Sequence, residues 1–400
     1  MTVMKGRLAR VLARWRIIFI LVSLIKLLLM VWVAPYGDLL NFALGAESVL
    51  GFLKLGRFPS FSSTGVYGPL QVLLAPFLWV WFMLPIEHPP ILSIGLFSHS
   101  TSGLIFAFLI KLPSFLADIG TGIVVLRLVK QLTNSDLNGA VAFLLWYANP
   151  FNIFWIQAFG WMDVIPTFIL VLALMFVYER RWFCCGVCVS VATVLRLFPV
   201  LIVPFLLLAV KTDRKRAYFH LFSGLILPLM CGFVVLYATG AGTLMSIISA
   251  PLSAPWLLDF LGFKITSDSV RLVPVLLTVQ FYVIVRYWRE RTPLQLVAVS
   301  LLALLTAHTY GGINHHFIWV APFLSVSAAL NYDELWIFAL TFVTGSLYPF
   351  IIPLPSSLYP MVHVLDPTYA GAFFAAKAAY LLKINLKSIR PGPFPEKQAP

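Results

Sequence analysis

The stretch YGPLQVLLAPFLWVWFMLP, residues 67–85, decides the topology of this chain. It is apolar and nearly as long as the roughly 20 residues that a membrane-spanning helix needs. If it crosses the membrane, every later span is inverted and the basic loops that follow face outward. If it lies on the outer surface, those loops face the cytoplasm together with the basic N-terminus, as the positive-inside rule requires. The sequence therefore predicts an interfacial helix, with its aromatic residues in the headgroup region: Phe77, Trp79, Trp81 and Phe82.

The composition is typical of an integral membrane protein. Of the 400 residues, 60% are hydrophobic and only 11% are charged, whereas an average soluble domain has about 25% charged residues. These values exclude an ordinary soluble domain and a disordered chain. We interpret the net charge of +13 as a marker of the cytoplasmic side, not as a sign of nucleic acid binding. The cysteines lie in apolar runs and are interpreted as packing residues: Cys184, Cys185, Cys188 and Cys231.

The apolar runs predict an all-α polytopic membrane protein with about twelve transmembrane helices. The first run, 17–34, follows a basic cluster and lacks a cleavage site, so we expect a retained helix. Two short runs, 183–196 and 198–210, are separated near Pro199, which cannot continue a helical hydrogen-bond ladder. They predict a hairpin of short helices with its tip near the outer face. The remaining predicted spans are 104–129, 139–158, 164–180, 218–238, 271–288, 293–310, 316–330, 335–352 and 369–384.

We expect a single transmembrane domain, residues 1–388, followed by a disordered cytoplasmic tail at 389–400. Both termini then lie in the cytoplasm, and the loop 35–103, with its interfacial helices, lies outside. A cell membrane and an endoplasmic reticulum membrane both fit this multi-pass topology, because both place the basic loops in the cytosol.

Few acidic residues fall on the predicted outer side. Asp38 and Glu47 follow the first helix, and Asp163 lies in the turn between two spans. Each aspartate either caps the helix that follows it or has a functional role, because charge near a membrane interior is costly. Paired acids are what acid–base chemistry on a sugar requires. Asp38 and Asp163 are therefore candidate catalytic residues, and Glu47 is a candidate for substrate binding.

Arg196 is the most informative cation on the outer side. It lies in an apolar hairpin, where a guanidinium needs an anionic partner. That partner is either Asp163, Asp118 or the phosphate of a bound lipid. Lys111 lies at the outer end of its span, where it either snorkels to the headgroups or contacts the same phosphate.

Other polar and aromatic residues gather near the outer face. His315 and His316 begin the outer end of a later helix, and adjacent helical residues do not face each other as a metal pair would. They either contact a substrate phosphate or sugar, or belong to an interfacial loop. A divalent metal is only weakly signalled, and no cofactor is firmly implied. Tyr67 and Trp161 are either belt residues or platforms that stack on a sugar.

Several short motifs follow one another in a characteristic order. After Asp38 come Tyr67-Gly68-Pro69-Leu70, Lys111-Leu112-Pro113 to Arg127, Asn149-Pro150, Gly160-Trp161-Met162-Asp163, Gly186 to Arg196-Leu197-Phe198-Pro199, and HHFIWVAPF from His315. In this order the chain resembles the GT-C superfamily of integral-membrane glycosyltransferases, over most of residues 15–325. Three positions depart from the family pattern. Asp38 lacks the second acid common in the first loop, Arg196 stands for a lysine, and Met162 stands for a glutamine.

The resemblance implies a mannosyltransferase-like enzyme that uses a sugar linked to polyprenyl or dolichyl phosphate. It implies transfer, outside the cytoplasm and with inversion, to a hydroxyl of a glycan, lipid or protein. Asp38 would be the general base, and Asp163 would orient the base, the acceptor or Arg196. The cations beside the departing phosphate would be Arg196, Lys111 and one of the pair His315 and His316.

Two other functions remain open at this point. A transporter or lipid flippase would need polar groups at the middle of its spans, where the sequence has Lys26, Asp118 and Lys377. A non-catalytic subunit on the same fold would explain the missing second acid. Most polar groups nevertheless gather at the outer face, which favours the enzyme.

Overall fold

The computed structural model describes residues 15–33, 38–54, 68–91, 100–196, 199, 202–210, 213–238, 318–319 and 321–330. Within these ranges every regular element is helical and there is no strand, which confirms the predicted all-α class. The elements are α2 (Trp15–Trp32), α3 (Asp38–Lys54), α5 (Gly68–Met83), α6 (Thr101–Thr133), α7 (Asp136–Tyr147), α8 (Pro150–Asn152), the π-helix η3 (Ile153–Ala158), α9 (Val164–Tyr178), α10 (Trp182–Leu195), α11 (Val203–Ala209), α12 (Arg214–Ala238) and α17 (Ala321–Leu330).

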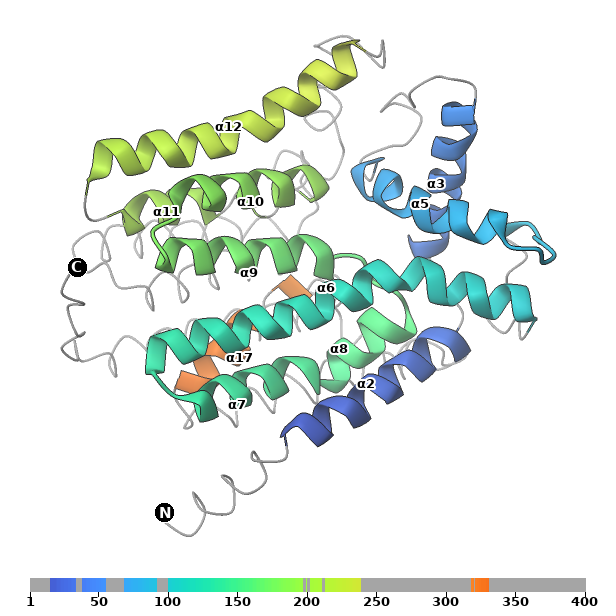
Figure 1. The fold of residues 1–400 in the computed structure, drawn as a ribbon, viewed down its shortest axis with the longest axis horizontal. Helices are drawn as coiled ribbons and strands as arrows, with labels where there is room; N and C mark the ends of the chain where they lie inside the picture. The colour runs from blue at the N-terminus through green and yellow to red at the C-terminus, as the bar shows by residue number, and fades with distance from the viewer. Residues whose placement is uncertain are drawn as a thin grey trace, which may run out of the picture.

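Most helices lie side by side with nearly parallel axes. Figure 1 shows α6, α7, α9, α10 and α12 running back and forth between the same two ends, while α3 and α5 lie at one end, with α3 turned across the others. Residues within the turn itself determine the reversal between α6 and α7. Asn134 ends α6 in the left-handed region (φ 52°), and the Ser135 hydroxyl caps α7 by accepting from the Asn138 N–H at 3.3 Å. The chain therefore turns back tightly, and α17 packs behind α6 and α7.

Two described helices, α2 (18 residues) and α6 (33 residues), are long and apolar enough to cross a membrane. A third candidate is α7 together with α8 and η3, which are bent by 41° at the break before Pro150. The other apolar helices in the described part of the chain are shorter. An extended apolar face of α2 is exposed, from Ile17 to Trp32, and its buried residues are Lys26 and Met30. This pattern is what a helix bordered by lipid requires.

The predicted runs correspond to observed helices wherever the structure describes them. The runs 17–34, 104–129, 164–180 and 183–196 match α2, α6, α9 and α10, and 139–158 is the bent pair. The chain breaks at Arg196 as Pro199 predicts, but α11 is shorter than the run 198–210. Helix α12 begins at Arg214, before the start predicted at 218, and α17 begins at Ala321, after the start predicted at 316. The tail and the predicted spans 271–288, 293–310, 335–352 and 369–384 lie outside the described residues.

The helix predicted at 67–85 is α5, and it lies at the end of the layer where α2 ends and α6 begins (Figure 1). It packs against α3 through a buried side that includes Leu70, Leu74 and Leu78. Trp79 is 51% exposed, in keeping with a headgroup residue. The expectation for Trp81 was wrong: its ring is fully buried, and its indole N–H donates to the Ser102 carbonyl at 3.3 Å.

Helices α10 and α12 approach each other closely at two glycines. A Cβ on Gly186 would lie 2.3 Å from the Leu221 carbonyl oxygen, and a Cβ on Gly224 would lie 2.3 Å from the Phe183 carbonyl oxygen. Small residues let helix backbones approach in this way, and such contacts drive association in a membrane. Because both obstacles are backbone atoms, neither can be moved by a change of rotamer.

We therefore expect Gly186→Ala to destabilise the protein by about 1–3 kcal/mol, because the added methyl forces the two helices apart. The matched control is Gly51→Ala, since a Cβ at Gly51 meets nothing within 4 Å and alanine is the better helix former. Thermal unfolding in detergent should show a lower midpoint for the first variant and an equal or higher one for the second. Equal midpoints would contradict the close crossing.

Candidate functional site

A tight turn links η3 to α9 at the end of the bundle where α2 also ends. Asn149 caps the segment by accepting from the Phe151 N–H at 2.9 Å, and η3 ends at Ala158. Gly160 then adopts φ +77°, and a Cβ there would lie 2.1 Å from Leu39 Cδ2. Glycine is required here because it tolerates a positive φ and because the space beside Leu39 admits no Cβ. The turn therefore packs directly against the first residues of α3, the helix that begins at Asp38.

The carboxylate of Asp163 joins three distant segments and is fully buried. Its Oδ1 accepts from Arg196 Nε at 2.6 Å, and its Oδ2 accepts from the Trp319 indole N–H at 3.0 Å. Although Asp163 directly precedes α9, its side chain forms no cap hydrogen bond. The side chain therefore belongs to a polar cluster and does not cap the helix, which was one of the alternatives left by the sequence.

Arg196 ends α10 in an extended conformation, with φ −153°, and its side chain is 14% exposed. Its carboxylate partner is Asp163 and not Asp118. A buried ion pair is costly to break, because removal of one partner leaves an uncompensated charge. The pair therefore holds the end of α10 against the start of α9 while the guanidinium keeps some access to the surface.

Lys111 is fully buried and does not snorkel. Its ammonium donates to the carbonyl oxygen of Val33, at the end of α2, at 2.5 Å and to that of Ala158, at the end of η3, at 2.6 Å. These carbonyls belong to helix ends, which have no intrahelical partner. Lys111 thus ties the end of α2 and the turn that leads to Asp163 to the first third of α6.

A second buried ion pair lies deeper in the bundle. Lys26 of α2 pairs with Asp118 of α6, and neither side chain is exposed. Gln157 also donates to Asp118 Oδ2 at 2.9 Å, and the Lys26 ammonium lies 3.6 Å from the centroid of the Tyr147 ring. The two charges that the transporter hypothesis invokes within described spans therefore neutralise each other.

Of the remaining predicted residues, the structure describes the side chains of Trp161 and Glu47. Trp161 is buried with its ring edge-on to Trp155 at 5.6 Å between centroids, and Glu47 is exposed on α3. Tyr67, His315 and His316 lie outside the described residues, as does the side chain of Asp38. Within the described ranges there is no group of three His, Cys, Asp or Glu side chains that would hold a metal.

Sequence reasoning missed two residues of this region. Trp319 lies within the motif HHFIWVAPF, and its indole N–H, which reaches Asp163, is the group that makes this motif relevant to the site. Gln157, on the π-helix, was not singled out at all. Gln157 could have been identified as a polar side chain inside the apolar run 139–158. The structure places it in a π-helix, a helix type that is frequent at functional sites.

Trp319→Phe removes one donor from a buried carboxylate while it keeps most of the ring. We expect a loss of about 1.5–3 kcal/mol, the range for hydrogen bonds to charged groups. The control is Trp79→Phe on the exposed side of α5, which should change stability by less than about 0.5 kcal/mol. Chemical unfolding in detergent measures both. A double-mutant cycle of Trp319→Phe with Asp163→Asn that shows no coupling would refute the contact.

Comparison of the chain with models of known families, with curated proteins and with solved structures finds no match. The function must therefore be inferred from the residues themselves. The strongest feature is the buried carboxylate of Asp163 with Arg196 and Trp319, beside the start of α3.

Proposed function

We propose that this protein is an integral-membrane glycosyltransferase that moves a hexose, such as mannose, from a polyprenyl or dolichyl phosphate to an acceptor hydroxyl. One observation carries the proposal. Three segments with motifs that resemble the GT-C superfamily, around Asp163, Arg196 and Trp319, meet at a single carboxylate. They are separated by up to 156 positions along the chain, so local sequence does not bring them together.

The proposed base is Asp38, at the first position of α3. The next residue, Leu39, contacts Gly160, three positions before Asp163. Consecutive Cα atoms are about 3.8 Å apart, so the backbone of Asp38 starts close to the turn that carries Asp163. This proximity supports one site built from the start of α3 and the turn before α9.

The transfer follows from these roles. The acceptor hydroxyl oxygen attacks the anomeric carbon and forms the new C–O bond, and its proton goes to Asp38. The bond between the anomeric carbon and the phosphate oxygen breaks on the opposite face, which inverts the configuration and releases the lipid phosphate. Negative charge grows on that phosphate, so a fixed cation beside it stabilises the transition state. Arg196 is the proposed cation, with His315 and His316 as further candidates.

Asp163 and Lys111 are proposed to position this site. Asp163 holds Arg196 at 2.6 Å, and it neutralises part of the guanidinium charge that a phosphate would otherwise meet. Lys111 is occupied by two backbone carbonyls, so we propose that it orders the turn and does not contact substrate. Trp161 and Tyr67 remain the proposed sugar platforms, and Glu47 a peripheral contact.

The proposed topology has about twelve spans, both termini in the cytoplasm and the site outside. Two features support it. The basic residues in the last turns of α6, between α9 and α10 and in the first turn of α12 lie at the end of the bundle opposite Asp163 (Figure 1), where the positive-inside rule expects cytoplasm. Helices α3 and α9, which start at Asp38 and directly after Asp163, begin toward the other end (Figure 1). The basic residues are Arg127, Lys130, Arg180, Arg181, Arg214, Lys215 and Arg216.

A transport function has less support. A pathway needs polar groups that line an open route near the middle of the spans. Purified protein, reconstituted with radiolabelled polyprenyl-phosphate mannose, separates the functions. Label that appears on an added acceptor supports the enzyme. Lipid that crosses the bilayer without transfer of its sugar would establish a flippase instead. If neither event occurs, the result points to a non-catalytic subunit.

Asp38→Asn should lower the transfer rate at least about a hundredfold, because general-base catalysis contributes about 10²–10⁴. The protein should remain monodisperse in detergent, since the change is isosteric. The control is Glu87→Gln, which removes an exposed acid from the segment that follows α5 and should transfer at the normal rate. Near-normal turnover by Asp38→Asn removes that residue from the role of base.

Arg196→Ala should weaken binding of the donor lipid more than binding of the acceptor, because only the donor has the phosphate. Loss of the ion pair with Asp163 also threatens folding, so Arg196→Lys is the second variant. It keeps a charge and should bind the donor better than the alanine variant does. Titration of polyprenyl-phosphate mannose measures both dissociation constants. An unchanged donor constant in a folded Arg196→Ala protein would leave the ion pair with a structural role alone.

A further inference from the structure

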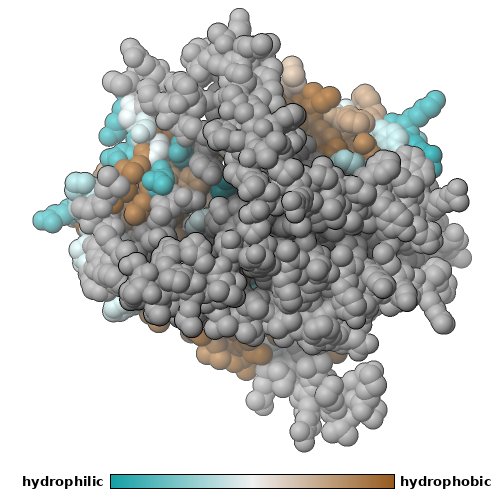
Figure 2. Space-filling model, turned by 180° about the vertical axis from the view of Figure 1, so that it is seen from behind, coloured by the Kyte–Doolittle hydropathy of each residue, from teal (hydrophilic) through white to brown (hydrophobic). Residues whose placement is uncertain are grey.

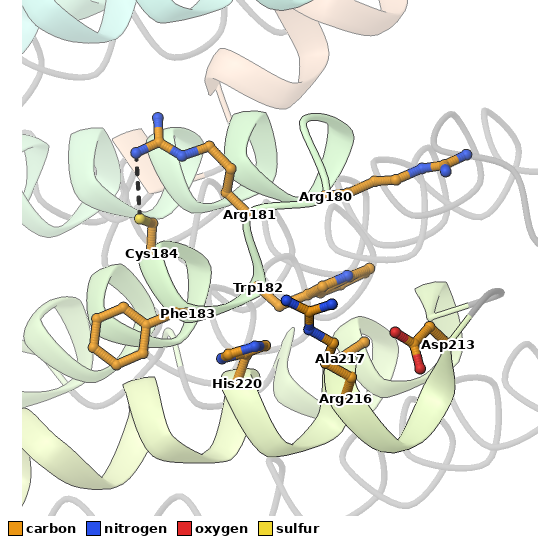
Figure 3. A pocket seen from close by; sticks show the side chains of 9 residues that line it. All are labelled: Arg180, Arg181, Trp182, Phe183, Cys184, Asp213, Arg216, Ala217 and His220. Carbon is orange, nitrogen blue, oxygen red and sulfur yellow. Dashed lines mark hydrogen bonds between the residues drawn. The ribbon is translucent and has the colours of Figure 1, made fainter. Parts of the chain in front are cut away.

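A second polar feature lies at the other end of the bundle. An open pocket of about 400 Å³ lies between the N-terminal ends of α10 and α12 (Figure 3). Three arginines and one histidine line it, together with Trp182 and a single acid, Asp213. The site proposed for sugar transfer uses none of these residues.

The basic side chains of the pocket differ in their direction. Arg216 and His220 come from successive turns of α12, four residues apart, and therefore share one side of the helix. Figure 3 shows both directed toward the space beside Trp182, whereas Arg180 extends away from it. Arg181 turns toward Cys184, at 3.6 Å from Sγ, and lies 3.7 Å from the Glu179 carboxylate. Arg216 and His220 are thus the groups that a ligand would meet.

The electrostatic environment favours an anion. Within the described residues Arg216 forms no ion pair. The N-terminal ends of α10 and α12 both border the pocket, and neither helix has an acid in its first turn. Helix N-termini carry partial positive charge, which adds to that of the arginines. Asp213 is the only acid in the lining, so positive charge is in excess.

Apolar surface continues directly from the basic pocket. Phe183, which lines it, is 40% exposed, and Phe219, next to His220, is 69% exposed. Farther along α12, Ile226 and Met230 are each 54% exposed. At the place of α12 in Figure 2, hydrophobic surface adjoins a hydrophilic tip. A soluble anion would use only the cations, whereas a phospholipid would also cover the apolar faces with its acyl chains.

From this juxtaposition we infer that the pocket binds the phosphate headgroup of an anionic phospholipid, with its chains along α10 and α12. The ligand chemistry is a phosphate ester, and its carrier is a membrane lipid. Arg216 and His220 donate to the phosphate oxygens, and Trp182 lies at the level of the headgroup, as aromatic residues do at membrane interfaces. This binding is independent of the proposed transfer reaction.

The test uses native mass spectrometry of the full chain in a neutral detergent, titrated with palmitoyl-oleoyl phosphatidylglycerol. Arg216→Gln should weaken binding about fivefold, since one basic residue contributes about 1 kcal/mol to the attraction of anionic lipid. Adding His220→Gln should weaken it further. The matched control is Lys215→Gln, which removes an exposed charge from the same turn of α12 but outside the pocket lining, and which should bind within twofold of the unchanged protein.

Three results would overturn the inference. Equal losses in Arg216→Gln and Lys215→Gln would mean that general surface charge attracts the lipid. Equal binding of palmitoyl-oleoyl phosphatidylcholine would mean that the pocket does not distinguish an anionic lipid from a zwitterionic one. Glycerol 1-phosphate that displaces phosphatidylglycerol at equal concentration would identify a soluble phosphate ester as the ligand, because the acyl chains would then contribute nothing. All variants change exposed or partly exposed residues, and an unchanged thermal midpoint verifies that they are folded.

Discussion

The buried carboxylate of Asp163 is the constraint around which the proposed site is built. A charge inside an apolar body must be paired and hydrogen-bonded, since an unpaired one costs several kcal/mol. Asp163 meets this need with Arg196 at the end of α10 and Trp319 before α17. The partners come from segments that lie far apart along the chain. The electrostatic requirement of one side chain thus orients three parts of the chain at one end of the bundle.

The same physics operates at two other places in the described structure. Lys26 and Asp118 join α2 to α6, and Lys111 joins the end of α2 to the end of η3 through backbone carbonyls. Apolar side chains alone do not distinguish a neighbouring helix from lipid tails, so polar contacts and close backbone approach select which helices pair. The crossing of α10 and α12 at Gly186 and Gly224 is the steric counterpart of these contacts.

The two ends of the bundle are chemically different. The end with Asp163 has an acid–base cluster beside the start of α3, and the opposite end has exposed arginines and an open basic pocket. A phosphate figures in both proposals, but in different roles. At the first end it is the leaving group of a reaction and needs a fixed, partly buried cation. At the second end it anchors a lipid and needs only accessible cations near apolar surface.

Apolar runs and breaks in the sequence determine the helices, because backbone hydrogen bonds must be satisfied within each apolar segment. They predicted α2, α6, α9 and α10, the break at Arg196 and the helical conformation of α5. Only the tertiary structure decided that Arg196 pairs with Asp163 and not with Asp118, that Lys111 turns inward, and that Trp319 completes the cluster. These contacts join residues 33, 47 and 156 positions apart. A local pattern specifies which segments are helical, whereas the pairing of buried charges depends on how whole helices pack.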